Sequence, residues 1–135
     1  MCLFVRLFVC LFVGLACDPI ARAGGSARGI VSVTYLDAIR SAQEKALRDD
    51  PRVFIYGQDV GGFGGAFKAT KNLAEKFPGR VIDSPISEDA MVGMAVGAAI
   101  EGMRPIVEMQ FADFSTVGLN QRLNHAATTF WRTVS

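Results

Sequence analysis

Beyond residue 17 the sequence contains no cysteine, and the whole chain of 135 residues has a single histidine, His125. Disulfides and zinc sites built from cysteine and histidine need several such side chains close together, so residues 18–135 are expected to form neither. An excess of positive charge is also missing, because 14 basic side chains face 13 acidic ones. Nucleic-acid binding usually needs a basic surface, so we expect no nucleic-acid partner.

The first 29 residues differ in composition from the rest of the chain. All three cysteines lie in the run MCLFVRLFVCLFVGLAC, which is apolar apart from Arg6 and repeats Leu-Phe-Val three times. This run is shorter than the ~20 residues that a membrane-spanning helix needs, and it is similar to the apolar part of a signal peptide. The flexible linker ARAGGSARG follows it. Three interpretations stay open: an export or anchor signal, an organelle-targeting leader, or a non-native extension upstream of a start near Ile30.

The expected location depends on which interpretation applies. Residues 30–135 carry 11 basic and 12 acidic side chains, an ordinary balance for a soluble domain. We expect a bacterial cytoplasmic protein, because a cytosolic type of domain follows the first 29 residues directly. A genuine leader would instead predict the mitochondrial matrix, export, or attachment to a membrane.

Strand-like and helix-like segments alternate along residues 30–135. Short runs rich in β-branched and apolar residues predict strands at residues 53–56, 80–82 and 104–111. Apolar positions at helical spacing predict helices at residues 34–48, 70–77, 87–102 and 115–132, the first of them capped by Thr34. Such alternation is typical of a three-layer α/β domain with a largely parallel sheet.

The helix predicted at residues 87–102 is unusual because it is apolar on every side. Pro85 breaks the preceding extended run, Ser87 can cap the helix, and Glu88 stands in its first turn, where the helix dipole favours a negative charge. A helix that is apolar all round is expected to be buried on all sides. Gly93, Gly97 and Ala98 are small enough to let another backbone approach closely. Glu88 therefore stands at the mouth of a buried helix, where a carboxyl is costly unless it has a function.

A glycine-rich loop follows the first predicted strand. The segment GQDVGGFGG matches neither of the two common glycine-rich phosphate-binding patterns, GxxxxGK[ST] and GxGxxG. We interpret its glycines as positions that need a positive φ angle or close approach of a neighbouring backbone. The loop should nevertheless lie at the carboxyl edge of the sheet, where open α/β sheets place their ligands.

Three blocks in order, GQDVGGFGGAFKATKNLAEKF, RVIDSPISEDAMVGMAVGAA and GMRPIVEMQFADF, carry a family resemblance. From about Val33 to Arg132 the chain resembles the β subunit of the thiamine-diphosphate-dependent 2-oxoacid dehydrogenase E1 component. This resemblance implies a transketolase-like pyrimidine-binding domain at residues 30–135. The family usually continues past Ser135 with further strands and a second domain. We therefore expect residues 30–135 to be a C-terminally truncated part of that domain.

The resemblance also implies a set of site residues. Glu88 matches the family glutamate that hydrogen-bonds N1′ of the thiamine aminopyrimidine and favours its imino tautomer. Phe114 matches the aromatic residue that packs on the pyrimidine ring, and Ile86 and Gln110 match other residues that line the cleft. Gln58 occupies the position of a family glutamate, and an amide cannot carry a proton as a carboxyl can. We therefore expect at most a polar contact from Gln58.

Three further polar residues are not expected to take part in catalysis. His125 is interpreted as a helix-surface or subunit-contact residue, because the family histidine in this subunit lies later in the sequence. Glu108 and Asp113 are interpreted as structural residues that make polar contacts at the end of the last strand and the start of the last helix. No cluster of oxygen ligands is apparent for a metal ion, so none of these residues is predicted to be a metal ligand.

The implied function is oxidative decarboxylation of a 2-oxo acid with thiamine diphosphate, followed by transfer of the acyl group to lipoyl-E2. The implied partners are an E1 α subunit, which would hold magnesium and the diphosphate, a second β subunit, and the lipoyl-E2 acyltransferase. GMRPIVE followed by QFADF favours branched-chain over pyruvate-like substrates. Two alternatives stay open: half of another transketolase-like thiamine enzyme, and a non-catalytic truncated remnant. The chain alone is expected to be inactive.

Overall fold

The computed structural model describes residues 33–133 and shows an α/β domain with nine short elements. The predicted leader at residues 1–29 lies outside the described residues. In chain order the elements are α1 (Tyr35–Asp49), β1 (Val53–Gly57), α2 (Leu73–Lys76), β2 (Val81–Asp83), α3 (Glu88–Ile100), β3 (Arg104–Glu108), the 3₁₀ helix η1 (Ala112–Thr116), the π-helix η2 (Gln121–Ala126) and α4 (Thr129–Thr133).

Three parallel strands form the sheet in the order β2-β1-β3, which confirms the predicted α/β class and parallel pairing. The prediction for the third strand was too long, since β3 ends at Glu108 rather than at Phe111. Glu108 pairs with Gly57, the last residue of β1, so β1 offers no further backbone partner beyond this point. Without such a partner the chain leaves the extended conformation and enters η1.

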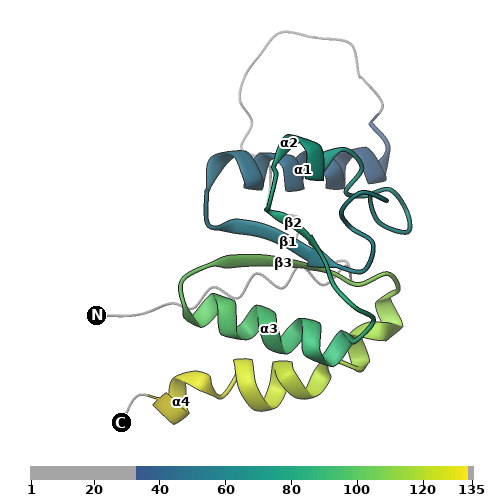
Figure 1. Cartoon of the computed structure of the whole chain (residues 1–135). Helices are drawn as coiled ribbons and strands as arrows, with labels where there is room; N and C mark the ends of the chain where they lie inside the picture. The colour runs from purple at the N-terminus through teal and green to yellow at the C-terminus, as the bar shows by residue number, and fades with distance from the viewer. Residues whose placement is uncertain (1–32, 134–135) are drawn as a thin grey trace, which may run out of the picture.

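Helices cover both faces of the sheet, as Figure 1 shows, with α1 and α2 on one side and α3 on the other. Alternate residues of β1 point to opposite faces, as the pleat of a strand requires. One core lies towards α1 and α2 and contains Leu47, Val53, Ile55, Val60, Leu73 and Val81. The other core lies towards α3 and contains Tyr56, Met91, Ala95 and Val107. These two cores make the predicted three-layer arrangement.

The two predicted helix caps have different outcomes. Thr34 caps α1 as predicted, because its Oγ1 accepts a hydrogen bond of 3.1 Å from the Asp37 backbone N–H. Ser87 stands at the N-cap position of α3, but its side chain makes no capping hydrogen bond. Its backbone carbonyl instead accepts the Met91 N–H at 2.9 Å, so only the backbone contact that begins a helix is present.

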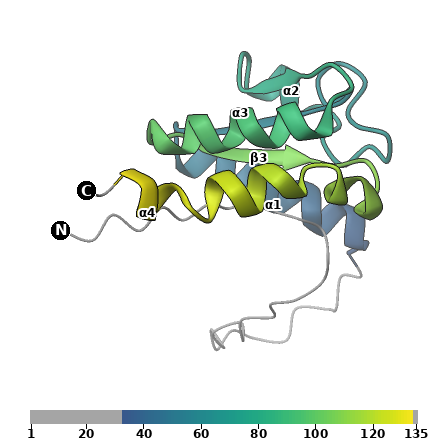
Figure 2. The same ribbon diagram turned by 90° about the horizontal axis from the view of Figure 1, so that it is seen from below.

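Helix α3 is buried on one side only, contrary to the prediction that every side would be covered. Met91, Val92, Ala95 and Val96 are buried, whereas Met94 is 61% exposed and Ile100 is 50% exposed. Within residues 33–133, β3 and η2 pack against this helix, and Figure 2 shows η2 running alongside it. The remaining side of α3 is therefore an apolar surface without a covering element in the described part of the chain.

The predicted final helix at residues 115–132 is wrong as a single α-helix. The Thr116 hydroxyl donates to the Asp113 carbonyl at 2.7 Å, and such a bond competes with regular helical pairing in η1. In η2 the Ala127 N–H donates to the carbonyl of Arg122, five residues earlier, which is π-helical spacing. The helix predicted at residues 70–77 also shortens to α2, because Asn72 is left-handed with φ of 65°. None of the described helices is long and apolar enough to cross a membrane.

Candidate functional site

The carboxyl ends of the three strands meet at one edge of the sheet, as predicted. Gly57 is in register with both Asp83 and Glu108, so β1, β2 and β3 end side by side. The Ser84 N–H donates to the Gly57 carbonyl at 2.8 Å and holds the segment that leads into α3 against this edge. Ligand sites of open parallel sheets lie at this edge.

Gln58 and Glu88, thirty residues apart in the sequence, contact each other at this edge. The Gln58 side chain is 7% exposed, and its Nε2 donates a hydrogen bond of 3.1 Å to Glu88 Oε1. The same nitrogen lies 4.0 Å from the sulfur of Met91, one helical turn further along α3. The amide therefore orients the Glu88 carboxyl and leaves its second oxygen for another group. Gln58 thus makes a polar contact with Glu88, and its role in cofactor binding stays a prediction.

The first turn of α3 is also in contact with η2. Gln121 Nε2 donates to Asp89 Oδ2 at 2.9 Å. A Cβ atom on Gly118 would lie 2.6 Å from Cγ2 of Val92, so only glycine allows this close packing. Close approach was predicted at Gly93, Gly97 and Ala98 but not at Gly118. Gly93 does face the side chain of Gln121, whereas nothing lies within 4 Å of a Cβ placed on Gly97.

The other predicted site residues lie in different surroundings. Ile86 is 82% exposed in the segment before α3. Phe114 lies in η1 and packs edge-on against Phe111, with 5.4 Å between the ring centroids. Phe111 in turn packs edge-on against Phe67 at 5.6 Å, which connects η1 to the glycine-rich loop. Within residues 33–133, no hydrogen bond joins Gln110 to the Gln58–Glu88 pair.

The glycine-rich loop has the structural features that the sequence predicted. Gly64 and Gly65 have positive φ angles of 83° and 79°, a region that other residues rarely adopt. The Gly61 N–H donates to Asp83 Oδ1 at 2.7 Å, which fixes the loop to the end of β2. The Thr70 hydroxyl donates to the Val60 carbonyl at 2.7 Å and closes the loop from its other end. Hydrogen bonds thus fix the loop at both of its ends.

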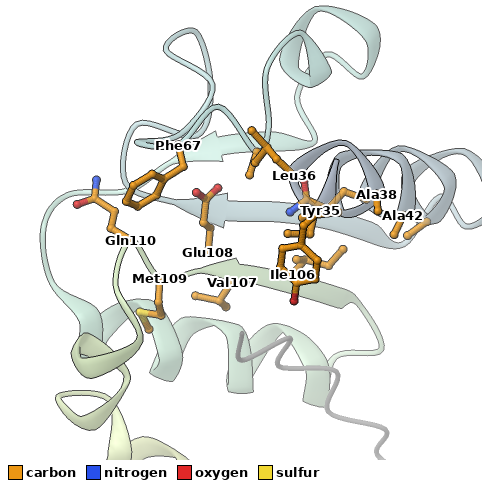
Figure 3. A pocket seen from close by; sticks show the side chains of 14 residues that line it. Tyr35, Leu36, Ala38, Ala42, Phe67, Ile106, Val107, Glu108, Met109 and Gln110 are labelled. Atoms are coloured by element: carbon orange, nitrogen blue, oxygen red, sulfur yellow. The ribbon is translucent and has the colours of Figure 1, made fainter. Parts of the chain in front are cut away.

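Glu108 is a residue that the sequence analysis misjudged. It lines a cavity of about 660 Å³ between α1, β3 and the segment that follows the glycine-rich loop, shown in Figure 3. Its Oε2 atom is buried and makes no hydrogen bond, so the predicted polar contacts are not made by this oxygen. Burial raises the pKa of the Glu108 carboxyl to about 7. The signal was available in the sequence: Glu108 is two residues from Ile106, and alternation places both on the same face of the sheet.

The two remaining polar residues lie on the surface. His125 is exposed in η2, in agreement with the prediction of a helix-surface residue. Asp113 is also exposed, and its backbone carbonyl accepts the Thr116 hydroxyl. In the described range 33–133, no group of three or more histidine, cysteine or acidic side chains is arranged to hold a metal ion.

The Gln58–Glu88 pair can be compared with what thiamine diphosphate, the cofactor that the resemblance implies, would need. An aminopyrimidine nitrogen needs a carboxyl that is fixed in place, and Gln58 fixes Glu88 while leaving Oε2 without a hydrogen bond to a described residue. An aromatic ring is also present, because Phe114 follows the same edge of the sheet on η1. Together these residues fit the pyrimidine half of thiamine diphosphate.

The family model described as "Transketolase, pyrimidine binding domain" matches residues 31–134. The chain belongs to this family. The match covers every described element, so the sheet, α3 and the edge that carries Gln58 and Glu88 all lie within the matched domain.

Individual relatives narrow the comparison. The chain is 48% identical over 101 residues to the 2-oxoisovalerate dehydrogenase subunit beta of Bacillus subtilis (strain 168), and the aligned region covers 74% of this chain and 31% of that protein. It is 43% identical over 108 residues to the protein of the same name from Pseudomonas aeruginosa, covering 79% and 31%. It is 48% identical over 98 residues to the pyruvate dehydrogenase E1 component subunit beta of Mycoplasma pneumoniae, covering 72% and 30%. The chain thus spans about three tenths of the length of these relatives.

Proposed function

We propose that this chain supplies the pyrimidine-binding half of a thiamine diphosphate site in a 2-oxoacid dehydrogenase E1 component. The observation that carries the proposal is the Gln58–Glu88 hydrogen bond at the carboxyl edge of the sheet, in a chain of the transketolase pyrimidine-binding family. The names of the relatives, which include 2-oxoisovalerate and pyruvate dehydrogenase beta subunits, support the reaction class.

In this proposal each residue has a distinct task. Glu88 exchanges a hydrogen bond with the ring nitrogen of the aminopyrimidine, and Gln58 keeps the carboxyl turned towards it. Phe114 packs against the ring, while Ile86 and Gln110 border the cleft. Bound thiamine diphosphate would supply the carbanion chemistry that cleaves 2-oxo acids, and the protein would position and tune it.

The other half of the site must come from a partner. No acidic metal cluster occurs within residues 33–133, whereas a diphosphate group needs magnesium or several cations. We propose that an E1 α subunit supplies this half in an assembly with a second β subunit, and that the product acyl group passes to a lipoyl-E2 acyltransferase. The cytoplasm is the proposed location.

The test is reconstitution with a partner. The 135-residue chain is co-expressed with an E1 α subunit from a related bacterium and purified through a tag on the α subunit. The complex is then given thiamine diphosphate, magnesium, an artificial electron acceptor and either 2-oxoisovalerate or pyruvate. We expect co-purification and thiamine-dependent turnover, with 2-oxoisovalerate preferred, and no turnover by the chain alone. Failure of the complex to turn over any 2-oxo acid would refute the proposal.

A further inference from the structure

Strand β3 lies at one edge of the described sheet, and one of its two sides has no partner there. In the order β2-β1-β3, β1 pairs with one side of β3, and no strand within residues 33–133 pairs with the other side. The cavity beside Glu108 runs along this outer side, because residues 106–110 line it together with α1 (Figure 3). The outer edge therefore presents backbone groups as well as side chains to whatever lies along it.

The backbone groups on this edge follow from the pairing with β1. The Arg104 N–H donates to the Arg52 carbonyl at 2.9 Å, so the backbone groups of Arg104 face β1. Successive residues of a strand point in opposite directions, so Pro105 and Val107 direct their backbone groups outward. Pro105 has no N–H to leave unpaired, and proline at such a position is typical of an edge strand.

Val107 is buried although it lies at the edge of the described sheet. It is 2% exposed, and Pro105 is buried as well. Buried backbone N–H and carbonyl groups are nearly always paired in folded proteins, so the outward groups of Val107 are expected to have partners. A strand laid along the edge supplies a carbonyl for the N–H and an N–H for the carbonyl. The edge therefore fits a further strand.

The chain contains an apolar segment with a strand-like pattern outside the described residues. Within residues 3–13, Leu-Phe-Val recurs every four residues. Alternate side chains of a strand share a face, so as a strand this segment would have one face made of leucine and valine alone. Phenylalanine and valine are both enriched in strands. The leucine and valine face matches the apolar walls of the cavity, which include Ile39 and Ile106.

The segment is attached to the domain next to the cavity. Tyr35, the first residue of α1, lines the cavity. The 21 residues between Val13 and Tyr35 can extend to roughly 70 Å, whereas a strand of five residues is about 17 Å long. Residues 3–13 can therefore reach any point on β3 of their own chain. The exposed side of α3 fits a strand less well, because a helix pairs its backbone groups internally.

We propose that residues 3–13 pair with the outer edge of β3 as a fourth strand, with their leucine and valine face in the cavity beside α1. The backbone of the segment pairs with the outward groups of Val107 and with the Pro105 carbonyl. Its apolar side chains cover Ile39 and Ile106 and remove this surface from water. The inference applies to the chain that keeps residues 1–17, and it does not depend on the proposed function.

Amide hydrogen exchange of the 135-residue chain, followed by NMR, tests the proposal at Val107. The double variant Phe8→Pro/Val9→Pro removes two adjacent N–H groups, one of which would face β3, so it should prevent pairing. We expect the Val107 N–H to exchange at least about tenfold faster in this variant than in the parent chain. The Ile55 N–H, which donates to the Arg80 carbonyl at 2.8 Å, should not change. Equal exchange at Val107 in the parent and the variant would overturn the proposal.

The matched control for this variant is Leu15→Pro/Ala16→Pro, which carries the same change outside residues 3–13. It should leave exchange at Val107 at the rate of the parent chain. If this control speeds exchange as much as Phe8→Pro/Val9→Pro does, the protection does not come from residues 3–13 and the proposal is wrong.

A second pair of variants changes the cavity instead of the segment. Ala42→Lys places a charge in the apolar cavity from an exposed position of α1, so it should also speed exchange at Val107 several-fold. Ser41→Lys, at an exposed position that does not line the cavity, is its control and should have no effect. Unchanged exchange at Val107 in Ala42→Lys would show that the segment does not lie in the cavity, contrary to the proposal.

Two further measurements distinguish other arrangements. Because the segment and the edge belong to one chain, exchange at Val107 should stay constant over an about tenfold range of protein concentration. Slower exchange at the higher concentration would assign the edge to a second copy of the chain. The methyl signals of Met94 and Ile100, on the exposed side of α3, should be the same in the parent and in Phe8→Pro/Val9→Pro. A change at these signals without one at Val107 would place the segment on α3, and either result would overturn the proposal.

Discussion

The two faces of the sheet each carry one glutamate near the carboxyl edge, and the two residues are held in different ways. On the α3 face, Glu88 accepts a hydrogen bond from Gln58, and the turn around it is braced through Asp89 and Gln121. On the α1 face, Glu108 packs against loop backbone with a buried oxygen that has no partner. Glu88 is thus oriented by a hydrogen bond within the protein, whereas one oxygen of Glu108 has no hydrogen-bond donor. The difference shows that position at the sheet edge alone does not define what a carboxyl does.

The largest expected effect on stability comes from a substitution in the buried core on the α1 face, and it is compared with a substitution on the exposed side of α3. Leu47 is fully buried, so Leu47→Ala should lower the free energy of unfolding by about 3 kcal/mol. Ile100 on α3 is 50% exposed, and Ile100→Ala should cost less than about 1 kcal/mol. Urea unfolding followed by circular dichroism measures both. A similar loss for the two variants would show that Ile100 is buried in solution, contrary to its 50% exposure in this structure.

The next effect is the pH dependence that Glu108 gives to stability. Its pKa is raised from 4.5 to about 7 in the folded state, so the folded chain binds more protons than the unfolded chain between these values. Stability contributed by this group should therefore fall as the pH rises from 4.5 to 7 and stay level above 7. Glu108→Gln should be nearly neutral at pH 4.5 and stabilising at pH 8, on the order of 2 kcal/mol after solvent screening. If the difference in the free energy of unfolding between Glu108→Gln and the parent chain does not change with pH, the Glu108 carboxyl is not buried as described.

A further comparison, whose two effects should have opposite signs, uses two glycines on the α3 face. Gly118→Ala should destabilise the chain by about 1–3 kcal/mol, because the new methyl group would overlap Val92. Gly97→Ala has open space and lies inside a helix, so it should stabilise by about 0.5–1 kcal/mol. Thermal unfolding of the two variants shows whether each substitution raises or lowers the stability of the chain. If Gly97→Ala also destabilises, something packs on that part of α3 in solution.

The sequence predicted the parts of the molecule that depend on local pattern and strand direction. Alternating strands and helices predicted the parallel sheet, and parallel strands must end at one edge, which is where Gln58 meets Glu88. The unpartnered state of Glu108 depends on how α1 packs over β3, and no local pattern contains that information. The break of the last helix was missed for a similar reason. It is associated with a hydroxyl that bonds back to the chain and with the packing of Gly118 on Val92.

The central claim, that Glu88 rather than Glu108 is the functional carboxyl of the cofactor site, has one most direct test. The complex of this chain with an E1 α subunit is titrated with thiamine diphosphate and magnesium, using the parent chain, Glu88→Gln and Glu108→Gln. We expect Glu88→Gln to weaken cofactor binding about tenfold, because a charge-assisted hydrogen bond to the ring is lost. We expect Glu108→Gln to leave the dissociation constant within about twofold, because Glu108 faces the separate cavity. Equal weakening by both substitutions, or weakening by Glu108→Gln alone, would contradict the account.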